Sequence, residues 1–407
     1  MLPAATQSGH LLVPCSPGAA PMLENELRAL GRPVIRTRDT SVETEGGWPE
    51  IFSLNLQLRT AQRVLLEVGH GRVRTADNLY SHVRRMPWER WIPVDGYLTV
   101  SSFVHNPSLR DPRFATLRCK DAIVDRLREI NGRRPDSGND RSGAVVFLYW
   151  NEETAIIYLD TSGETLARRG YRKIPLEAPM QESLAAAVVM STGWTGQTNF
   201  INPMCGSGTL AIEAALLALG RAPGITRPGF AFEHLLGFDP QGWREARRAA
   251  AQAPPRTFSG RIIATDINPA AIEAARENAR AAGVADQIEF SVCDFADSPV
   301  PEGGGVVLLN PEYGARMGDA ATLEPLYRSI GDFFKQRCRG YLGGVFTGNL
   351  ELGQRVGLRP RRRTAFSSGG LDCRLFLFEL YEGTKRTRVP AMPVPVTEPA
   401  ATEQSPR

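Results

Sequence analysis

The chain has 407 residues, which is too long for one ordinary domain and enough to bury a core in each of two or three. Hydrophobic residues make up 42% and charged residues 23%, which is the balance of a soluble globular protein, and no apolar run is long enough to span a bilayer. The net charge is only +4, so attraction to nucleic acid would depend on where the basic residues lie.

The six cysteines and five histidines are dispersed, with no C-x-x-C pair and no cluster of metal-ligand spacing. This pattern favours free thiols in a reducing compartment and predicts no metal site. The first residues also lack the charged and then apolar order of a signal segment. We therefore expect a cytoplasmic protein that makes no contact with a membrane, and we expect a monomer.

The first part of the chain mixes strands and helices. Residues 11–31 are typical of a strand, a Pro/Gly turn and an amphipathic helix that ends at Gly31. The patterns that follow predict helices over 60–69, 76–88 and 116–130. They also predict a strand over 96–104 and a hairpin formed by 144–150 and 153–160. This mixed order favours α+β units over a parallel βαβ array.

From about Gly170, predicted strands alternate with predicted helices. The strands are expected over 198–205, 261–266, 288–294, 306–310, 341–348 and 373–380. The helices are expected over 178–194, 208–220 and 269–283, with one more near Trp243. This alternation specifies a doubly wound, mostly parallel sheet. Residues 383–407, rich in Pro, Thr and charge, are expected to form a disordered tail.

A glycine-containing turn, NPMCGSGT, lies between the first strand and helix of this second part. Gly206 and Gly208 allow the backbone to approach a ligand closely and to present N–H groups at the start of a helix. The turn lacks the spacing of a dinucleotide fingerprint and the lysine of a phosphate-binding loop. It predicts a ligand site at the carboxyl end of the strand, where open α/β sheets bind ligands.

The next two strand ends carry acidic residues. Asp266 can accept hydrogen bonds from both hydroxyls of a ribose, while Asn268 is better placed than Asp266 to cap the following helix. Asp294 can accept a hydrogen bond from an exocyclic amine, and Ile267 or Phe295 can cover a flat ring. With the glycine turn, these residues predict a pocket for S-adenosylmethionine (SAM), because no basic cluster gathers there for a triphosphate.

The fourth strand end is Asn310-Pro311-Glu312-Tyr313. The Asn310 side-chain oxygen and the Pro311 carbonyl can accept both N–H groups of an amine conjugated to a ring, so that its lone pair points at a methyl donor. The Tyr313 ring can stack on the base, and no strong base is required, because methyl transfer depends mainly on orientation and proximity. An Asn-Pro turn could merely end a strand, but its place in this series favours a catalytic role.

The motifs NPMCGSGT, TDINP, NPEYG and GGLDCRLFLF resemble those of class I, SAM-dependent RNA guanine-N2 methyltransferases with an N-terminal THUMP domain, above all the group that acts on large-subunit ribosomal RNA. The resemblance covers nearly everything before the tail. It implies an α/β fold with a Rossmann-like methyltransferase sheet at the C-terminal side, preceded by α+β ferredoxin-like and THUMP domains. The expected limits are 1–52 for the ferredoxin-like domain, 53–165 for THUMP and 166–382 for the methyltransferase.

The resemblance implies functional residues at the positions that match the family's motifs. The catalytic group would be Asn310, Pro311 and Tyr313. The cofactor-binding group would be Ser183, Asn202, Pro203, Cys205, Gly206, Ser207, Gly208, Thr209, Asp266, Ile267, Asp294 and Phe295. Arginine clusters, each of which alone is typical of a solvated surface, would together supply RNA contacts. These are expected at Arg133, Arg134, Arg168, Arg169 and Arg172.

Two positions depart from the family pattern. Asn202 stands where the family usually has Asp, which removes a charge near the cofactor but keeps an acceptor. Glu312 stands where the family has a second proline, which frees a backbone angle and places a carboxylate beside the stacking ring. We expect the chemistry to be retained, with a cost in rate at Glu312.

The expected function is methyl transfer from SAM to the N2 amine of a guanosine in 23S ribosomal RNA, with the target base flipped into the pocket. A tRNA guanine-N2 methyltransferase of the same type and an adenine-N6 methyltransferase remain alternatives. A third alternative is a non-catalytic RNA-binding or ribosome-assembly protein with a SAM-type fold. Glu312 favours this last alternative, whereas the intact glycines and acidic residues of the cofactor site argue against it.

Overall fold

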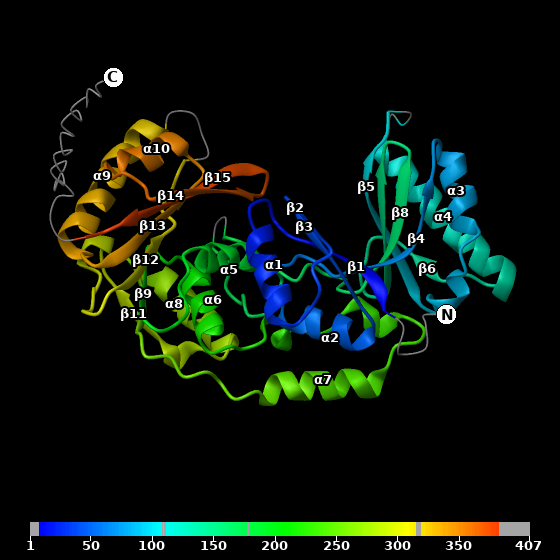
Figure 1. Ribbon diagram of the computed structural model, residues 1–407, viewed down its shortest axis with the longest axis horizontal. Coiled ribbons are helices and arrows are strands. Elements are labelled where there is room, and N and C mark those ends of the chain that lie inside the picture. The colour runs from blue at the N-terminus through cyan, green and yellow to red at the C-terminus, as the bar shows by residue number, and fades with distance from the viewer. Residues whose placement is uncertain (1–7, 108, 110, 177–178, 315–318, 382–407) are drawn as a thin grey trace, which may run out of the picture.

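The computed structural model describes residues 8–107, 109, 111–176, 179–314 and 319–381. Two β-sheets dominate it, and Figure 1 shows them towards opposite ends of the molecule. Among the described helices, none combines the length and the apolar composition that crossing a membrane requires. The tail predicted over 383–407 lies outside the described residues.

The N-terminal sheet has eight strands in the order β2-β3-β1-β4-β8-β7-β5-β6. These strands are β1 (Gly9–Pro14), β2 (Arg36–Arg38), β3 (Ser41–Gly46), β4 (Leu65–Arg72), β5 (Tyr97–His105), β6 (Asp136–Ser137), β7 (Ala144–Asn151) and β8 (Thr154–Asp160). The accompanying helices are α1 (Ala20–Ala29), α2 (Trp48–Gln57), α3 (Ala76–Arg84) and α4 (Pro112–Asn131). β1 pairs with β4 in antiparallel fashion, so the first two predicted units share one continuous sheet.

The helix predicted over 60–69 is wrong. Leu65 and Leu66 are buried in β4, which pairs antiparallel with both β1 and β8. Pairing on both sides satisfies the backbone and buries the apolar run, and these tertiary contacts outweigh the local helical pattern. The other predicted elements of this half are present as α1, α3, α4, β5 and the β7–β8 hairpin. The sequence did not predict α2, and the expected domain limit at residue 52 falls inside it.

The C-terminal sheet has the order β11-β10-β9-β12-β13-β15-β14. Its strands are β9 (Asn199–Pro203), β10 (Ile262–Asp266), β11 (Ile288–Val292), β12 (Gly305–Leu309), β13 (Tyr341–Thr347), β14 (Arg362–Ser368) and β15 (Leu371–Glu379). Its helices are α5 (Glu182–Ser191), α6 (Thr209–Ala218), α7 (Pro240–Gln252), α8 (Pro269–Ala281), α9 (Asp319–Arg337) and α10 (Leu350–Arg355). The first five strands in the sheet order are parallel, and β15 and β14 run antiparallel to their neighbours. The expected α/β fold is therefore confirmed.

Helices cover both faces of this sheet because alternate residues of its strands point in opposite directions. Phe200 and Ile262 belong to the core cluster that includes residues of α5, α6 and α8. Their neighbours Ile201 and Ile263 belong to a second cluster with residues of α9 and α10. β9 lies between β10 and β12, so the strand order reverses at β9 and creates a switch point. The loops after β9 and β12 flank this point, which is where ligands bind in such sheets.

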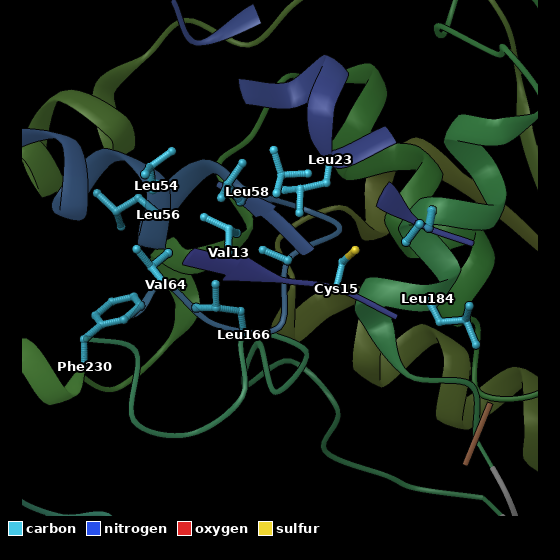
Figure 2. Close-up of a cluster of buried hydrophobic side chains, with 14 of the residues drawn as sticks. Val13, Cys15, Leu23, Leu54, Leu56, Leu58, Val64, Leu166, Leu184 and Phe230 are labelled. Carbon is cyan, nitrogen blue, oxygen red and sulfur yellow. The ribbon is translucent and has the colours of Figure 1, made fainter. Parts of the chain in front are cut away.

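A continuous hydrophobic core joins the two halves of the chain. Figure 2 shows Val13 of β1, Leu23 of α1 and Leu56 of α2 in the same buried cluster as Leu184 of α5 and Phe230 of the segment after α6. The N-terminal helices therefore pack directly against the C-terminal half, and the halves are not separated by a free linker.

The segment between α6 and β10 strengthens this joint by folding back on α2. The ring centroids of Phe52 in α2 and Trp243 in α7 lie 5.6 Å apart, and those of Trp48 and Phe232 lie 6.5 Å apart. Arg227 of this segment is 3% exposed, and its guanidinium donates to main-chain carbonyls of the connection that follows β8. Aromatic packing and a buried cation therefore hold the connection in place beside the C-terminal sheet.

Candidate active site

The predicted glycine turn connects β9, which ends at Pro203, to α6, which begins at Thr209. Gly206 and Gly208 have φ angles of 54° and 83°. A Cβ on Gly208 would lie 2.9 Å from the Cβ of Ala275 in α8, so this position requires glycine. A Cβ on Gly206 would meet nothing within 4 Å. One side of the turn thus packs against α8, while the backbone at Gly206 borders open space that a ligand could fill.

The end of β10 holds this turn from one side. The Cys205 N–H donates to the Thr265 carbonyl at 2.9 Å, and the Gly206 N–H donates to the Asp266 carboxylate at 2.9 Å. The other Asp266 oxygen accepts from the Asn268 N–H at 3.0 Å. Asn268 caps α8 with its side chain, as predicted. Asp266 is therefore held in one orientation at the carboxyl end of β10.

Asn278 of α8 holds the turn from a second side. Its Nδ2 donates to the Ser207 carbonyl at 3.1 Å, and its Oδ1 accepts from the Lys173 N–H at 2.7 Å. The side chain is 1% exposed. One buried amide therefore ties the glycine turn to the connection that arrives from the N-terminal half.

Arg172 of the same connection holds the turn from a third side, which corrects its predicted role as an RNA contact. Its guanidinium donates to the Ser207 hydroxyl at 3.2 Å and to the Thr209 hydroxyl at 3.3 Å. It also donates to Glu182 at 3.2 Å and to the Met180 carbonyl at 2.8 Å. The side chain is only 15% exposed, so its charge supports the glycine turn and is not presented to RNA.

The predicted adenine-binding residues differ in exposure. Asp294 is exposed, and its carboxylate accepts the Ala296 N–H at 2.9 Å. Ile267 follows β10 and is 68% exposed, which makes it an available wall for a flat ring. The Phe295 ring is 8% exposed and packs edge-on against Phe333 of α9. Its ring therefore belongs to the core, which corrects the prediction that it could sandwich a base.

The predicted catalytic loop follows β12. Asn310 is partly buried, Pro311 is buried and Glu312 is exposed. The Tyr313 ring lies over the backbone at Gly348, where an added Cβ would be 2.9 Å from Cε2 of the ring. Burial raises the pKa of the Tyr313 phenol, so it stays protonated at neutral pH. The ring thus has a fixed support on one side.

Three acceptor oxygens of the predicted site are buried without a hydrogen-bond partner: Ser183 Oγ, Asn202 Oδ1 and Asn310 Oδ1. The orientation of the Asn202 amide follows from its Nδ2, which donates to the Leu308 carbonyl at 2.9 Å and links β9 to β12. A buried unpaired oxygen costs about 1–3 kcal/mol, and a ligand with N–H or O–H groups would remove that cost. Ser183 and Asn202 fit SAM, which carries hydroxyl, amine and ammonium donors, whereas Asn310 at the end of β12 fits an N–H group of a substrate base.

The remaining predicted RNA contacts separate into exposed and buried residues. Arg133 and Arg134 follow α4 and are exposed, and Arg168 is exposed and pairs with Glu164. Arg169 is 1% exposed and lies 3.0 Å from Glu213 of α6, so its prediction as an RNA contact is wrong. An arginine that is paired inside the core cannot reach a phosphate group.

The sequence did not identify three residues that support the site: Asn278, Gly348 and Tyr327. The Tyr327 hydroxyl of α9 donates to the Glu312 carbonyl at 3.2 Å. Gly348 is the last residue of a predicted strand, which is a weak signal of close backbone approach. Asn278 and Tyr327 carry no local signal, because their partners lie on distant segments.

Three family models match consecutive parts of the chain: the RlmL ferredoxin-like domain over residues 10–65, the THUMP domain over 73–160 and the RMKL-like methyltransferase domain over 169–376. The ribosomal RNA large subunit methyltransferase K/L of Syntrophotalea carbinolica is 37% identical over 90% of this chain and 53% of its own length. The chain therefore spans about half of that relative. A proposed RNA methyltransferase of Synechocystis sp., slr0064, is 33% identical over 89% of this chain and 95% of its own length.

Solved structures agree with the fold over nearly the whole chain. A possible methylase from Clostridium difficile 630 has a TM-score of 0.84 and 28% identity, covering 93% of this chain and 100% of that one. SMU.472, a proposed methyltransferase complexed with S-adenosylhomocysteine (SAH), has a TM-score of 0.82 and 26% identity over the same shares of the two chains. The chain belongs to the RMKL-like methyltransferase family, in the form that carries an RlmL-type ferredoxin-like domain and a THUMP domain before the catalytic domain.

Proposed function

We propose that this protein transfers a methyl group from SAM to the N2 amine of a guanosine in 23S ribosomal RNA. The observation that carries the proposal is the Asn310 side-chain oxygen, which is buried without a partner where β12 ends. β12 is the direct neighbour of β9, whose glycine turn would hold the cofactor. Substrate acceptor and methyl donor would thus meet at the switch point of the sheet.

The cofactor site would be built from the ends of β9, β10 and β11. SAM supplies an activated methyl group on its sulfonium when bound. Backbone N–H groups near Gly206 and Gly208 would receive its amino-acid end, and Asp266 would accept the ribose hydroxyls. Asp294 would accept the adenine amine, while Ile267 covers the ring.

The substrate site would be built from the end of β12. Asn310 Oδ1 and the Pro311 carbonyl would accept the two N–H groups of the amine, which turns its lone pair towards the methyl group. The Tyr313 ring, supported by Gly348, would stack on the base. Because the raised pKa keeps this phenol protonated, its role would be positioning and not proton removal.

The substrate assignment rests on the relatives and on the domains before the catalytic one. The relative from Syntrophotalea carbinolica is named a large-subunit ribosomal RNA methyltransferase, and the THUMP part precedes the catalytic domain in this chain as well. Arg133, Arg134 and Arg168 remain exposed candidates for phosphate contacts. A ribosomal RNA substrate would place the protein in the cytoplasm.

The test is to delete the gene in its native host and to map methylated nucleotides in ribosomal and transfer RNA by mass spectrometry. We expect one N2-methylguanosine of 23S RNA to disappear, to return with the wild-type gene and to stay absent with Asn310→Ala. Loss of N2-methylguanosine from tRNA alone would favour the tRNA alternative, and loss of N6-methyladenosine would replace the base assignment. If neither SAM nor SAH raises the melting temperature, a non-catalytic RNA-binding role would replace the proposal.

A further inference from the structure

One residue of the proposed catalytic loop departs from the pattern of the family that the sequence resembles. Glu312 stands where that family has a second proline, and its side chain is exposed. A residue other than proline can adopt a wider range of φ angles, so the loop backbone has lost one covalent constraint. The main-chain carbonyl of Glu312, however, accepts a hydrogen bond at 3.2 Å from Tyr327 of α9.

The Tyr327 hydroxyl takes part in an ordered chain of hydrogen bonds. Tyr327 and Thr347 are both 0% exposed, and their hydroxyl oxygens lie 2.8 Å apart. A carbonyl can only accept, so when the single phenol proton goes to Glu312, the Thr347 hydroxyl is the donor to the phenol oxygen; its other acceptor, the Asn349 carbonyl, lies farther away at 3.4 Å. The Asn349 N–H donates to the Thr347 hydroxyl at 3.1 Å, which fixes that oxygen at the end of β13.

The same end of β13 supports the stacking ring. Gly348 lies between Thr347 and Asn349, and its backbone contacts the Tyr313 ring so closely that a Cβ would lie 2.9 Å from the ring. The end of β13 thus acts twice on the catalytic loop. It orients the phenol that binds the carbonyl of residue 312, and it supports the ring of residue 313.

We propose that Tyr327 is a positioning residue that replaces the missing proline by holding the Glu312 carbonyl, and so keeps Asn310 and Tyr313 in place for the target base. This role rests on the proposed function, because it acts through the loop that would hold the substrate. Tyr327 touches neither substrate nor cofactor in this role. Its effect should therefore depend on whether residue 312 can move.

The test is a double-mutant cycle of Tyr327→Phe and Glu312→Pro. Phenylalanine keeps the buried ring and removes only the hydroxyl, and proline restores the covalent constraint. We expect Tyr327→Phe to lower the single-turnover rate of RNA methylation at saturating SAM about tenfold, because loss of orientation slows transfer. In the Glu312→Pro background the same change should cost less than about twofold. Equal fold-losses in both backgrounds, or no loss in either, would overturn the proposal.

Tyr341→Phe is the matched control. Tyr341 is 4% exposed and begins β13, at the end of that strand away from the catalytic loop. Its phenol oxygen accepts a hydrogen bond from Asn199 of β9. Its loss should lower the melting temperature without changing the single-turnover rate. Thr347→Ser should keep the rate and Thr347→Val should lower it, because only serine retains the hydroxyl that orients the phenol. A rate loss as large with Tyr341→Phe as with Tyr327→Phe would assign both effects to general destabilisation.

Hydrogen exchange separates this proposal from the proposed function. Without RNA, Tyr327→Phe should speed amide exchange in the peptide over residues 306–314, and Glu312→Pro should suppress that increase. If the wild-type protein methylates no guanosine but this exchange pattern is found, the function fails and the positioning role stands. If the wild-type protein methylates guanosine and Tyr327→Phe leaves the amide exchange of this peptide unchanged, the positioning role fails and the function stands.

Discussion

The two loops at the switch point of the C-terminal sheet are held in very different ways. The glycine turn after β9 donates hydrogen bonds to the end of β10 and accepts them from Asn278 of α8 and from Arg172 of the connection between the halves. In the described part of the catalytic loop after β12, the Glu312 carbonyl is bound by one phenol, and the Tyr313 ring lies over one glycine. The proposed cofactor side is thus preorganised from several directions, whereas the described part of the proposed substrate side depends on few contacts.

This difference suits the two ligands. A cofactor of constant shape is bound best by a turn that is already in place, since little ordering has to occur on binding. A base that must leave an RNA structure needs a loop that can admit it and then hold it. Changes on the two sides should therefore have separable effects on stability, cofactor affinity and rate.

The largest effect is expected beneath the cofactor side, at the buried pair of Arg169 and Glu213. Arg169→Met leaves the Glu213 carboxylate buried with less compensation, so the free energy of unfolding should fall by about 3–5 kcal/mol. Arg169→Met/Glu213→Leu should recover most of this loss, and Arg168→Met on the exposed neighbour should change little. Denaturant unfolding of the wild type and of these three variants measures the free energies of unfolding. Full stability in Arg169→Met would contradict the buried pairing.

This loss should also depend on pH. Burial raises the pKa of Glu213 and Arg169 opposes that rise, so removing the arginine raises the pKa in the folded state further. A carboxyl whose pKa is higher folded than unfolded favours folding below its unfolded pKa and disfavours it as the pH rises. The deficit of Arg169→Met should therefore be larger at pH 8 than at pH 5, and a deficit that grows towards acid pH would contradict this assignment.

The next largest effect is expected at the catalytic loop. Asn310→Ala removes one of the two proposed amine acceptors, so the single-turnover rate should fall about 100-fold. The affinity for SAH, measured by calorimetry, should stay within about twofold, because the proposal has the amide facing the substrate. Asn310→Asp, which keeps an acceptor oxygen, should lose less rate. Equal losses of rate and SAH affinity would show that Asn310 contacts the cofactor and not the substrate.

A smaller effect is expected on the cofactor turn itself. Arg172→Gln removes the bonds from the guanidinium to the Ser207 and Thr209 hydroxyls, so SAH affinity should fall about tenfold, or about 1.4 kcal/mol. The rate at saturating SAM should change less than the affinity. Arg168→Gln, four residues earlier and exposed, is the matched control and should leave SAH affinity unchanged. A purely RNA-dependent defect in Arg172→Gln would restore the prediction that Arg172 contacts RNA.

The smallest effect is expected at the exposed arginines after α4. Arg133→Ala and Arg134→Ala should each weaken RNA binding and reduce the slope of log affinity against log salt concentration by about 1. Arg169→Met should leave that slope unchanged, since its charge is buried. Fluorescence titrations at several salt concentrations measure this, and an unchanged slope in both alanine variants would make these arginines ordinary surface residues.

Chemistry at the ends of strands was readable from the sequence. The glycine turn, Asp266, Asn268 and the Asn-Pro loop lie where the strand pattern predicted them, because strand ends and turns depend on residues within a few positions of one another. The segment over 60–69 was mispredicted because strands that are distant in sequence pair with it on both sides. Helix α9 was not predicted at all, although it supplies Tyr327 to the catalytic loop.

The sequence by itself determined the fold class, through the alternation of strands and helices, and which chemical groups stand at the carboxyl ends of the strands, where the site is proposed. Only the tertiary structure decided which arginines face solvent and which are buried, since Arg169 pairs with a glutamate of α6 and Arg172 with the glycine turn. It also decided how the loop with Glu312 is held. The physical reason is that burial and hydrogen-bond partners depend on segments brought together by folding, and local patterns carry no record of them.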